Sequence, residues 1–502
     1  MLIGKSLIAG EWLASDETFE SAVVSGAPDT FYKGTPAMVD RAAKAAEEAF
    51  WSYGYSKGAE RVAFLRILTE EIEARGAEIT EVGVKETGLP AARLDGERGR
   101  TIAQINTFAD AVEDGAYLER VIDPALPDRE PLPRPELRSI QQPIGPVGVF
   151  GASNFPLAFS TAGGDTASAL AAGCPVVVKG HPAHPGIADL VAQAMEAAIN
   201  RAGVHPGVFS QVVDGGFAVG EALVKHPLIR AVGFTGSIRA GRALFDMCAA
   251  RPEPIPFFGE LGSTNPMFLL PEAMAARGGE IGAGWVGSLT MGVGQFCTNP
   301  GIAVVLDRPE AAGFIDAASA ALSEVGAEAM LTEGIAAAFR AGCQSAGGIA
   351  GVDTLVSTPP EGRNATPHLH VTSADIWMAN EALRDEVFGP FGIVVKASDM
   401  DQMREIARSL HGQLTATLHV DDGDLDEARS LMPILRRKAG RILANGFPTG
   451  VEIAAAMVHG GPYPASTNFG ATAGGPRAIR RFINPICYQN MPEALLPEAL
   501  RG

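Results

Sequence analysis

The 502-residue sequence lacks any concentration of positive charge. Its 40 lysines and arginines are outnumbered by 58 aspartates and glutamates, which gives a formal net charge of −18. Because nucleic-acid backbones are bound through clustered basic residues, we expect no DNA or RNA partner. Uninterrupted apolar runs of about 18 residues, the length that spans a bilayer, are also missing. We therefore expect no membrane span.

Cysteine is scarce, and no two cysteines are closely spaced. The five are Cys174, Cys248, Cys297, Cys343 and Cys487. An odd number of widely spaced cysteines, with no CxxC pair and no histidine pair at ligand spacing nearby, predicts neither a disulfide framework nor a metal site. The apolar stretch near the N-terminus is interrupted by Gly10, Glu11 and Asp16 before a signal-like segment forms. We expect a cytoplasmic protein without a bound metal.

What is present indicates a large folded chain. Hydrophobic residues make up 46% and charged residues 20% of a chain that is too long for one hydrophobic core. The early residues predict helices over 36–50 and 59–88, from apolar residues at helical spacing. Residues 124–146 hold seven prolines, which predict an extended arm or an edge strand because proline donates no backbone hydrogen bond.

From residue 147 onward, apolar strands alternate with helices. The expected strands are 147–153, 175–180, 208–216 and 229–237, each followed by a helical pattern. Such alternation predicts an α/β fold with a doubly wound parallel sheet, whose ligand site lies at the carboxyl ends of the strands. A second, less regular alternation after residue 256 predicts a second α/β domain.

Polar residues follow three of these strands. They are Asn154, Lys179 and Ser237, the last preceded by Gly236. Each alone is typical of a turn, a solvated lysine or a helix cap. Together at one sheet edge they favour a dinucleotide site, because a lysine suits a ribose or phosphate and a helix N-terminus suits a pyrophosphate.

Cys297 and Glu260 are the candidates for covalent chemistry. Cys297 lies among glycines and polar residues in "GVGQFCTNPG", whereas Cys174 and Cys248 lie in segments that favour burial. A free thiol is mostly protonated at neutral pH and needs a base or a cation to react. Glu260 follows two phenylalanines, and an apolar pocket raises the pKa of a carboxyl group into the range of a general base. The alternatives are a buried small cysteine and a solvated loop carboxylate.

Six short segments, each present once, stand out in order along the chain. They are "PIGPVGVFGASNFPL", "AAGCPVVVKGHPAHPG", "VGFTGSIRAG", "FFGELGSTNP", "GQFCTNPG" and "EVFGPFG". Through them the sequence resembles the aldehyde dehydrogenase superfamily over nearly its whole length. The resemblance implies a cofactor domain (1–123 and 147–256), a catalytic domain (257–463) and a bridging, oligomerising arm (124–146 and 464–502).

The resemblance also implies a role for each matching residue. Cys297 matches the nucleophile that forms a thiohemiacetal and then a thioester, Asn154 matches the oxyanion donor, and Glu260 matches the base that activates water. Cofactor contacts are implied for Lys179 at the adenosine ribose, Gly236 and Ser237 at the pyrophosphate, and Glu386 and Phe388 at the nicotinamide end.

The segment after Lys179 predicts the cofactor. Relatives that prefer NAD commonly have a glutamate here that bonds the ribose hydroxyls, whereas this chain continues with Gly180, His181 and Pro182. Without a carboxylate to repel the 2′-phosphate, we expect NADP to be accepted and preferred, with NAD also possible.

Within the superfamily, the sequence looks most similar to the branch that oxidises 2,5-dioxopentanoate (α-ketoglutaric semialdehyde) to 2-oxoglutarate, which implies this substrate. The alternative is a medium- or long-chain aliphatic aldehyde, which needs an apolar tunnel rather than a cation. Phe155, Phe159, Trp285 and Phe296 suit either, and no arginine can be singled out for the carboxylate.

Two further alternatives stay open. An acylating enzyme that releases its thioester to coenzyme A would not need Glu260 as a base for water. A catalytically inactive, ligand-binding relative would keep the fold and lose the chemistry. An apolar tail and an exposed sheet edge predict a homodimer or homotetramer.

Overall fold

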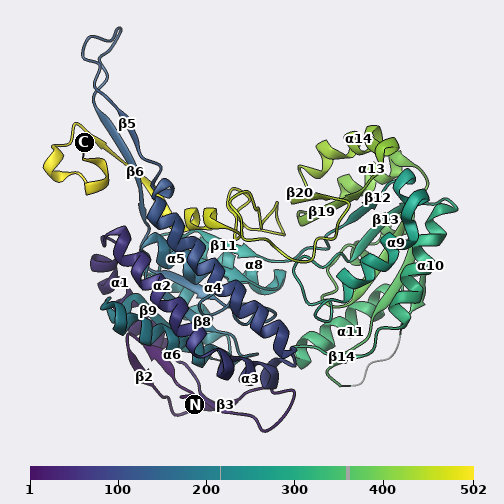
Figure 1. Cartoon of the computed structure of the whole chain (residues 1–502), viewed down its shortest axis with the longest axis horizontal. Helices are drawn as coiled ribbons and strands as arrows, with labels where there is room; N and C mark the ends of the chain where they lie inside the picture. Colours follow the sequence, from purple (N-terminus) through teal and green to yellow (C-terminus); the bar gives the residue numbers. More distant parts are fainter. Residues whose placement is uncertain (215, 358–361, 502) are drawn as a thin grey trace.

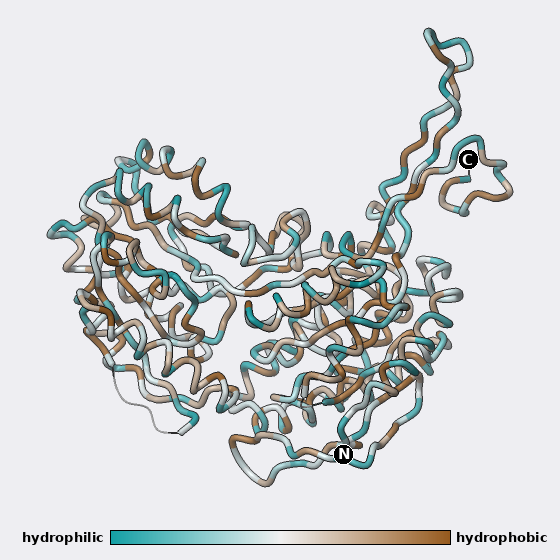
Figure 2. Tube along the Cα trace, turned by 180° about the vertical axis from the view of Figure 1, so that it is seen from behind, coloured by the Kyte–Doolittle hydropathy of each residue, from teal (hydrophilic) through white to brown (hydrophobic). Residues whose placement is uncertain are grey.

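In the computed structural model, which describes residues 1–214, 216–357 and 362–501, the chain forms two lobes and an extended arm (Figure 1). Each lobe is a sheet covered by helices. Figure 2 shows hydrophobic segments inside both lobes and hydrophilic segments along their outer surfaces. Within the described ranges, no helix is both long and apolar enough to cross a membrane.

A seven-stranded sheet forms the centre of the first lobe. Its order is β11 (Phe257–Glu260), β10 (Ala231–Thr235), β7 (Val147–Phe150), β8 (Val176–Gly180), β9 (Phe209–Val213), β1 (Ser6–Ile8) and β2 (Glu11–Leu13). The strands from β11 to β9 are parallel, and β1 and β2 add an antiparallel edge. The four predicted parallel strands are confirmed. Because β11 pairs with β10, the first sheet continues to Glu260, past the division expected at residue 256.

The helices of this lobe are α1 (Pro36–Tyr53), α2 (Gly58–Ala74), α3 (Gly76–Thr87), α4 (Ala91–Asp114), α5 (Gly164–Ala172), α6 (Pro185–Ala202), α7 (Ala218–Lys225) and α8 (Ile238–Ala249). The single helix predicted over 59–88 is wrong: it breaks at Arg75 (φ −100°, ψ 8°) into α2 and α3. The reason lies at Gly76, a poor helix former, where a Cβ atom would lie 2.7 Å from the Arg98 guanidinium carbon on α4.

A second seven-stranded sheet forms the centre of the other lobe. Its order is β15 (Val352–Val356), β17 (His368–Ser373), β18 (Phe391–Ala397), β13 (Ile302–Leu306), β12 (Met267–Leu269), β19 (Gln413–His419) and β20 (Ala439–Ala444). The predicted second α/β domain is confirmed as a parallel sheet with one antiparallel edge strand, β15. Its helices are α9 (Pro271–Thr290), α10 (Glu310–Ser323), α11 (Glu333–Gly347), α12 (Ala374–Ala379), α13 (Met400–Ser409) and α14 (Leu425–Leu435).

The arm is a three-stranded antiparallel sheet. Its strands, in order, are β21 (Ile483–Gln489), β6 (Leu137–Pro143) and β5 (Val121–Asp123). β6 is the middle strand rather than an edge, because most of the prolines in 124–146 precede it. Between β20 and the arm, the chain crosses from the second lobe back to the first (Figure 1), where Ser466 forms a β-bridge with Glu260. Two short pairs complete the sheets: β3 (Thr18–Glu20) with β4 (Thr30–Tyr32), and β14 (Glu328–Ala329) with β16 (Asn364–Ala365).

Candidate active site

Cys297 lies on the loop between α9 and β13, in the region where the two lobes meet. The backbone at Gly292, Val293 and Gly294 has positive φ angles of 57°, 59° and 64°. At Gly294 a Cβ atom would lie 2.2 Å from the carbonyl carbon of Gly389, so only glycine permits this approach. The Cys297 carbonyl accepts a hydrogen bond of 2.9 Å from the Asn265 amide. The loop is thereby fixed at the residue that bears the thiol.

The Cys297 side chain differs from those of the other cysteines. It is half-buried, whereas Cys174, Cys248 and Cys343 are buried and Cys487 is exposed. Burial raises the pKa of the Cys297 thiol well above its ordinary value, and the negative charge of Glu260 raises it further. The thiol is therefore protonated at neutral pH and needs a nearby base or cation to form the reactive thiolate.

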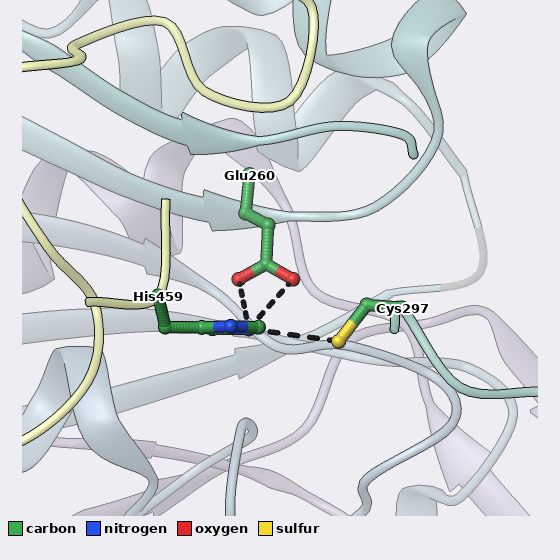
Figure 3. A group of neighbouring side chains, drawn as sticks. All are labelled: Glu260, Cys297 and His459. Atoms are coloured by element: carbon green, nitrogen blue, oxygen red, sulfur yellow. Dashed lines mark hydrogen bonds and ion pairs between the residues drawn. The ribbon is translucent and has the colours of Figure 1, made fainter. Parts of the chain in front are cut away.

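That group is His459, which lies between Glu260 and Cys297 (Figure 3). Its Nε2 atom is 3.5 Å from the Cys297 sulfur and 3.0 Å from both carboxylate oxygens of Glu260. The three residues come from the end of β11, the loop before β13 and the segment that crosses back from the second lobe. An imidazolium at this place has one N–H that reaches both the sulfur and the carboxylate.

The expected rise in the pKa of Glu260 is wrong. Burial does favour a raised pKa, but the charge of His459 and its hydrogen bond outweigh burial, so the pKa of Glu260 falls below its ordinary value of 4.5. Glu260 is only 7% exposed and nevertheless carries its charge at neutral pH. It is ready to accept a proton.

Sequence reasoning missed His459. The histidine precedes Gly460 and Gly461 and is separated from Cys297 by 162 residues. It belongs to no local pattern with either partner, and only the tertiary fold brings the three side chains together. The sequence therefore holds no spacing signal for it.

Asn154 lies beside the Cys297 loop, as the resemblance implies for an oxyanion donor. Its side-chain amide donates a hydrogen bond of 2.9 Å to the carbonyl of Gln295, two residues before Cys297. A primary amide has two N–H donors, so one donor remains after this bond to meet an oxygen near the thiol.

Three of the four predicted substrate-lining aromatics lie together near this loop. The Phe155 ring centroid is 5.4 Å from that of Phe159 and 5.1 Å from that of Phe296. Trp285 is not among them, and its assignment as a lining residue is wrong. It is fully buried in the core of the second lobe, where it stacks on Phe314 and its indole N–H bonds the Pro300 carbonyl at 2.7 Å. A fully buried indole packs the fold and leaves no surface for a substrate.

The residues predicted for a dinucleotide lie at the carboxyl ends of β8 and β10. The Lys179 ammonium donates to the Asp214 carbonyl at 3.0 Å, and burial lowers its pKa to about 8. Ser237 follows Gly236 and caps α8 by accepting a hydrogen bond from the Ala240 amide, and the first turn of α8 is exposed. An exposed helix N-terminus beside a lysine fits a pyrophosphate and a ribose.

Two pockets lie near the predicted site. One is lined by Glu386 and Phe388 together with residues of the Cys297 loop. The other is lined by Glu260, His459 and Thr235 at the end of β10. Burial raises the pKa of Glu386 to about 8, and the charge of Glu260 contributes. The chemistry of these donors and the space beside them fit a nicotinamide dinucleotide.

Comparison with known proteins identifies the family of the chain. The sequence profile described as "Aldehyde dehydrogenase family" matches residues 21–337. The chain belongs to this family. Aldehyde dehydrogenases of this family oxidise aldehydes with NAD(P). The chain is 48% identical over 506 residues to "Alpha-ketoglutaric semialdehyde dehydrogenase 2" of Azospirillum brasilense, covering 100% of this chain and 96% of the relative.

A second relative and a solved structure agree. The "Alpha-ketoglutaric semialdehyde dehydrogenase" of Acinetobacter baylyi is 44% identical over 505 residues, which cover 99% of this chain and 96% of the relative. A mutant of aldehyde dehydrogenase C from Pseudomonas syringae, solved in complex with NAD+ and octanal, superimposes with a TM-score of 0.81 at 23% identity, covering 98% of both chains. At that identity the likeness confirms the fold of this aldehyde dehydrogenase.

Proposed function

We propose that this aldehyde dehydrogenase oxidises 2,5-dioxopentanoate to 2-oxoglutarate, with Cys297 as nucleophile. Two relatives that match essentially the whole chain at 48% and 44% identity bear the name of this activity. The observation that supports the chemistry is the convergence of Cys297, His459 and Glu260 within hydrogen-bond reach, beside the Asn154 amide.

In the first half of the reaction, His459 stabilises the thiolate form of Cys297. The thiol releases its proton to water, and the His459 imidazolium, between the sulfur and the Glu260 carboxylate, stabilises the thiolate. The sulfur attacks the aldehyde carbon, and the oxygen becomes an oxyanion that the Asn154 amide and the Cys297 backbone N–H stabilise. One such donor lowers the activation barrier by about 3 to 4 kcal/mol. Bound NAD(P)+ supplies the acceptor for the hydride that the carbon then loses.

In the second half, Glu260 acts as the base. The thioester on Cys297 has no charge on sulfur, and the Glu260 carboxylate, kept ionised by His459, takes a proton from the attacking water. The hydroxide adds to the thioester carbon, the carbon–sulfur bond breaks, and the carboxylic acid leaves. A base placed for water supports hydrolysis over release to coenzyme A.

We assign the cofactor residues to the dinucleotide in the same way. Lys179 binds the adenosine ribose, Gly236 and Ser237 hold the pyrophosphate, and Glu386 and Phe388 position the nicotinamide end. NADP is the preferred form in this proposal, because Gly180, His181 and Pro182 after Lys179 carry no carboxylate that would repel a 2′-phosphate. Asp214, the nearest acid along the neighbouring strand, is only 6% exposed.

An initial-rate screen tests this proposal. 2,5-Dioxopentanoate, succinic semialdehyde and straight-chain aldehydes are each assayed with NAD+ and NADP+. The largest kcat/KM is expected for 2,5-dioxopentanoate with NADP+. A larger value for a medium- or long-chain aldehyde would assign the aliphatic alternative instead, and strong preference for NAD+ would reject the cofactor assignment.

We further propose that the chain self-associates as a dimer or tetramer through the arm. β21 pairs with β6 on one side only among the described strands, and an unpaired edge favours pairing with a second copy. Light scattering coupled to size exclusion measures the mass in solution, and a monomer would reject this proposal.

A further inference from the structure

Two half-buried arginines lie near the nucleophile without a carboxylate partner. Arg100 is on α4 in the first lobe and Arg441 is on β20 in the second. Among the residues that the structure describes, neither guanidinium lies within 4.0 Å of an acidic oxygen. Their hydrogen bonds go to neutral backbone carbonyls instead.

Both arginines hold the same stretch of chain. Arg100 donates to the Val451 carbonyl, and Arg441 donates to the Gly450 carbonyl at 2.9 Å and to the Pro448 carbonyl. Segment 448–451 leads directly toward His459. The two cations therefore come from opposite lobes and meet at segment 448–451, which precedes His459 along the chain.

The position of Arg100 on α4 directs it to the same region. Arg93, Glu97 and Arg100 follow one another at helical spacing and share one face of the helix. The Glu97 carboxylate accepts hydrogen bonds of 2.9 Å from the backbone amides of Leu157 and Ala158. This face of α4 thus lies on the loop that bears Asn154 and the lining phenylalanines.

Arg93 on the same face, by contrast, has a carboxylate partner. It pairs with Glu97 at 2.8 Å, and its guanidinium carbon lies 4.6 Å from the centre of the Phe155 ring. Arg100, further along the same face, has no acidic oxygen within 4.0 Å in the described ranges, and the carboxylates whose charges act on it are Glu452 and Glu97. Arginines and aromatic rings therefore lie on the same side of the site. A purely aliphatic substrate would not need the cation.

Electrostatics agrees that Arg100 and Arg441 are near the thiol. Burial lowers the pKa of each guanidinium. At Arg100 the charges of Glu452, Glu97 and then Cys297 oppose that effect, and at Arg441 the charge of Cys297 opposes it. Partly burying a cation is unfavourable unless an anion is in direct contact with it. Neither guanidinium has an acidic oxygen within 4.0 Å in the described ranges, which leaves both able to bind an anion that arrives with the ligand.

We propose that Arg100 and Arg441 form the receptor for the carboxylate of the substrate, which makes this enzyme selective for short aldehydes that bear an acid group. This inference rests on the proposed function and assigns the cation that sequence reasoning could not find. Arginine suits this task because its planar fork bonds both oxygens of a carboxylate. In 2,5-dioxopentanoate only four carbon–carbon bonds, each of about 1.5 Å, separate the aldehyde carbon from the acid.

The test compares Arg100→Gln and Arg441→Gln on two substrates of equal length, 2,5-dioxopentanoate and pentanal. The kcat/KM ratio of the first to the second is expected to fall by about ten- to a hundredfold in each variant, the usual effect of losing a charged hydrogen bond. Most of this fall is expected as a higher KM for the acid-bearing substrate. Arg408→Gln, which removes an exposed arginine of α13, is the matched control and leaves the ratio unchanged. Equal loss on both substrates, or no loss, would overturn the receptor.

A second measurement separates the receptor from the proposed substrate. Glutarate, a five-carbon dicarboxylate, is expected to protect Cys297 of the wild-type enzyme from alkylation by iodoacetamide, and at least about tenfold more weakly in both arginine variants. If the wild type does not oxidise 2,5-dioxopentanoate, the proposed function fails, and glutarate protection still decides the receptor. Equal protection of wild type and variants would reject it.

Discussion

Replacing His459 with glutamine tests the proton chemistry of the site. The variant removes the imidazolium charge that lies 3.5 Å from the Cys297 sulfur, and leaves the Glu260 carboxylate in place. A hydrogen bond to a charged group contributes about 1.5 to 3 kcal/mol, which is about a ten- to hundredfold change in equilibrium. The thiolate fraction of Cys297 at neutral pH is therefore expected to fall by that factor.

The assay is the rate of Cys297 alkylation by iodoacetamide as a function of pH, without aldehyde or cofactor. In His459→Gln the rate near neutral pH falls by about ten- to a hundredfold, and the inflection moves to higher pH, because burial and the Glu260 charge both raise the pKa of the thiol. His411→Gln, at an exposed histidine, is the control and keeps the wild-type profile. An unchanged rate and profile in His459→Gln would refute the role of the imidazole.

Three further outcomes follow from the same geometry. Because His459 lowers the pKa of Glu260, the hydrolytic step keeps its base ionised until the pH falls below about 4.5. His459→Gln removes the largest effects that oppose burial, so the acid limb of the kcat–pH profile moves to higher pH. Coincident acid limbs in wild type and variant would contradict the pairing. Trp285→Ala lowers the free energy of unfolding by about 3 to 5 kcal/mol, measured in denaturant titrations. Unchanged stability together with a changed KM would instead indicate that Trp285 lines the substrate site. The ligand atoms of Glu260, Cys297 and His459 lie within 4.8 Å of one another, so Zn²⁺ inhibits turnover by occupying them and EDTA restores it; loss of activity on adding EDTA alone would indicate a required metal.

Local sequence predicts much of this fold. The strands β7, β8, β9 and β10 are short apolar runs between helical patterns, and their parallel order follows from that alternation. The strands β1 and β2 have three residues each; β1 pairs with the distant β9, and β2 pairs with β1 at the edge of the sheet. No pattern within three residues reports such a partner.

The site shows the same division between local and tertiary information. Cys297, Glu260 and Asn154 stand in distinctive segments, and the structure brings all three to one region. His459 and the two arginines have no distinctive neighbours along the chain. The direction of the Glu260 pKa shift was wrongly predicted for that reason: burial can be inferred from the adjacent phenylalanines, but the opposing imidazole comes from a residue 199 positions further along the chain.

Trp285 illustrates a different limit. A tryptophan shortly before the cysteine loop is close to it in sequence, but α9 directs the indole into the second lobe, against Phe314. Sequence proximity does not distinguish the face of a helix that lines a site from the face that packs the core. The three phenylalanines that do gather near the loop lie on irregular segments.

The most direct test of the central claim is to trap the acyl group on the thiol. Glu260→Gln enzyme, which lacks the base for hydrolysis, is mixed with 2,5-dioxopentanoate and NADP+, quenched in acid and mapped by peptide mass spectrometry. We predict a burst of NADPH equal to the enzyme concentration and a 2-oxoglutaryl adduct on the peptide that contains Cys297. An adduct on Cys174, Cys248, Cys343 or Cys487, or a full burst with no adduct on any cysteine, would contradict the account.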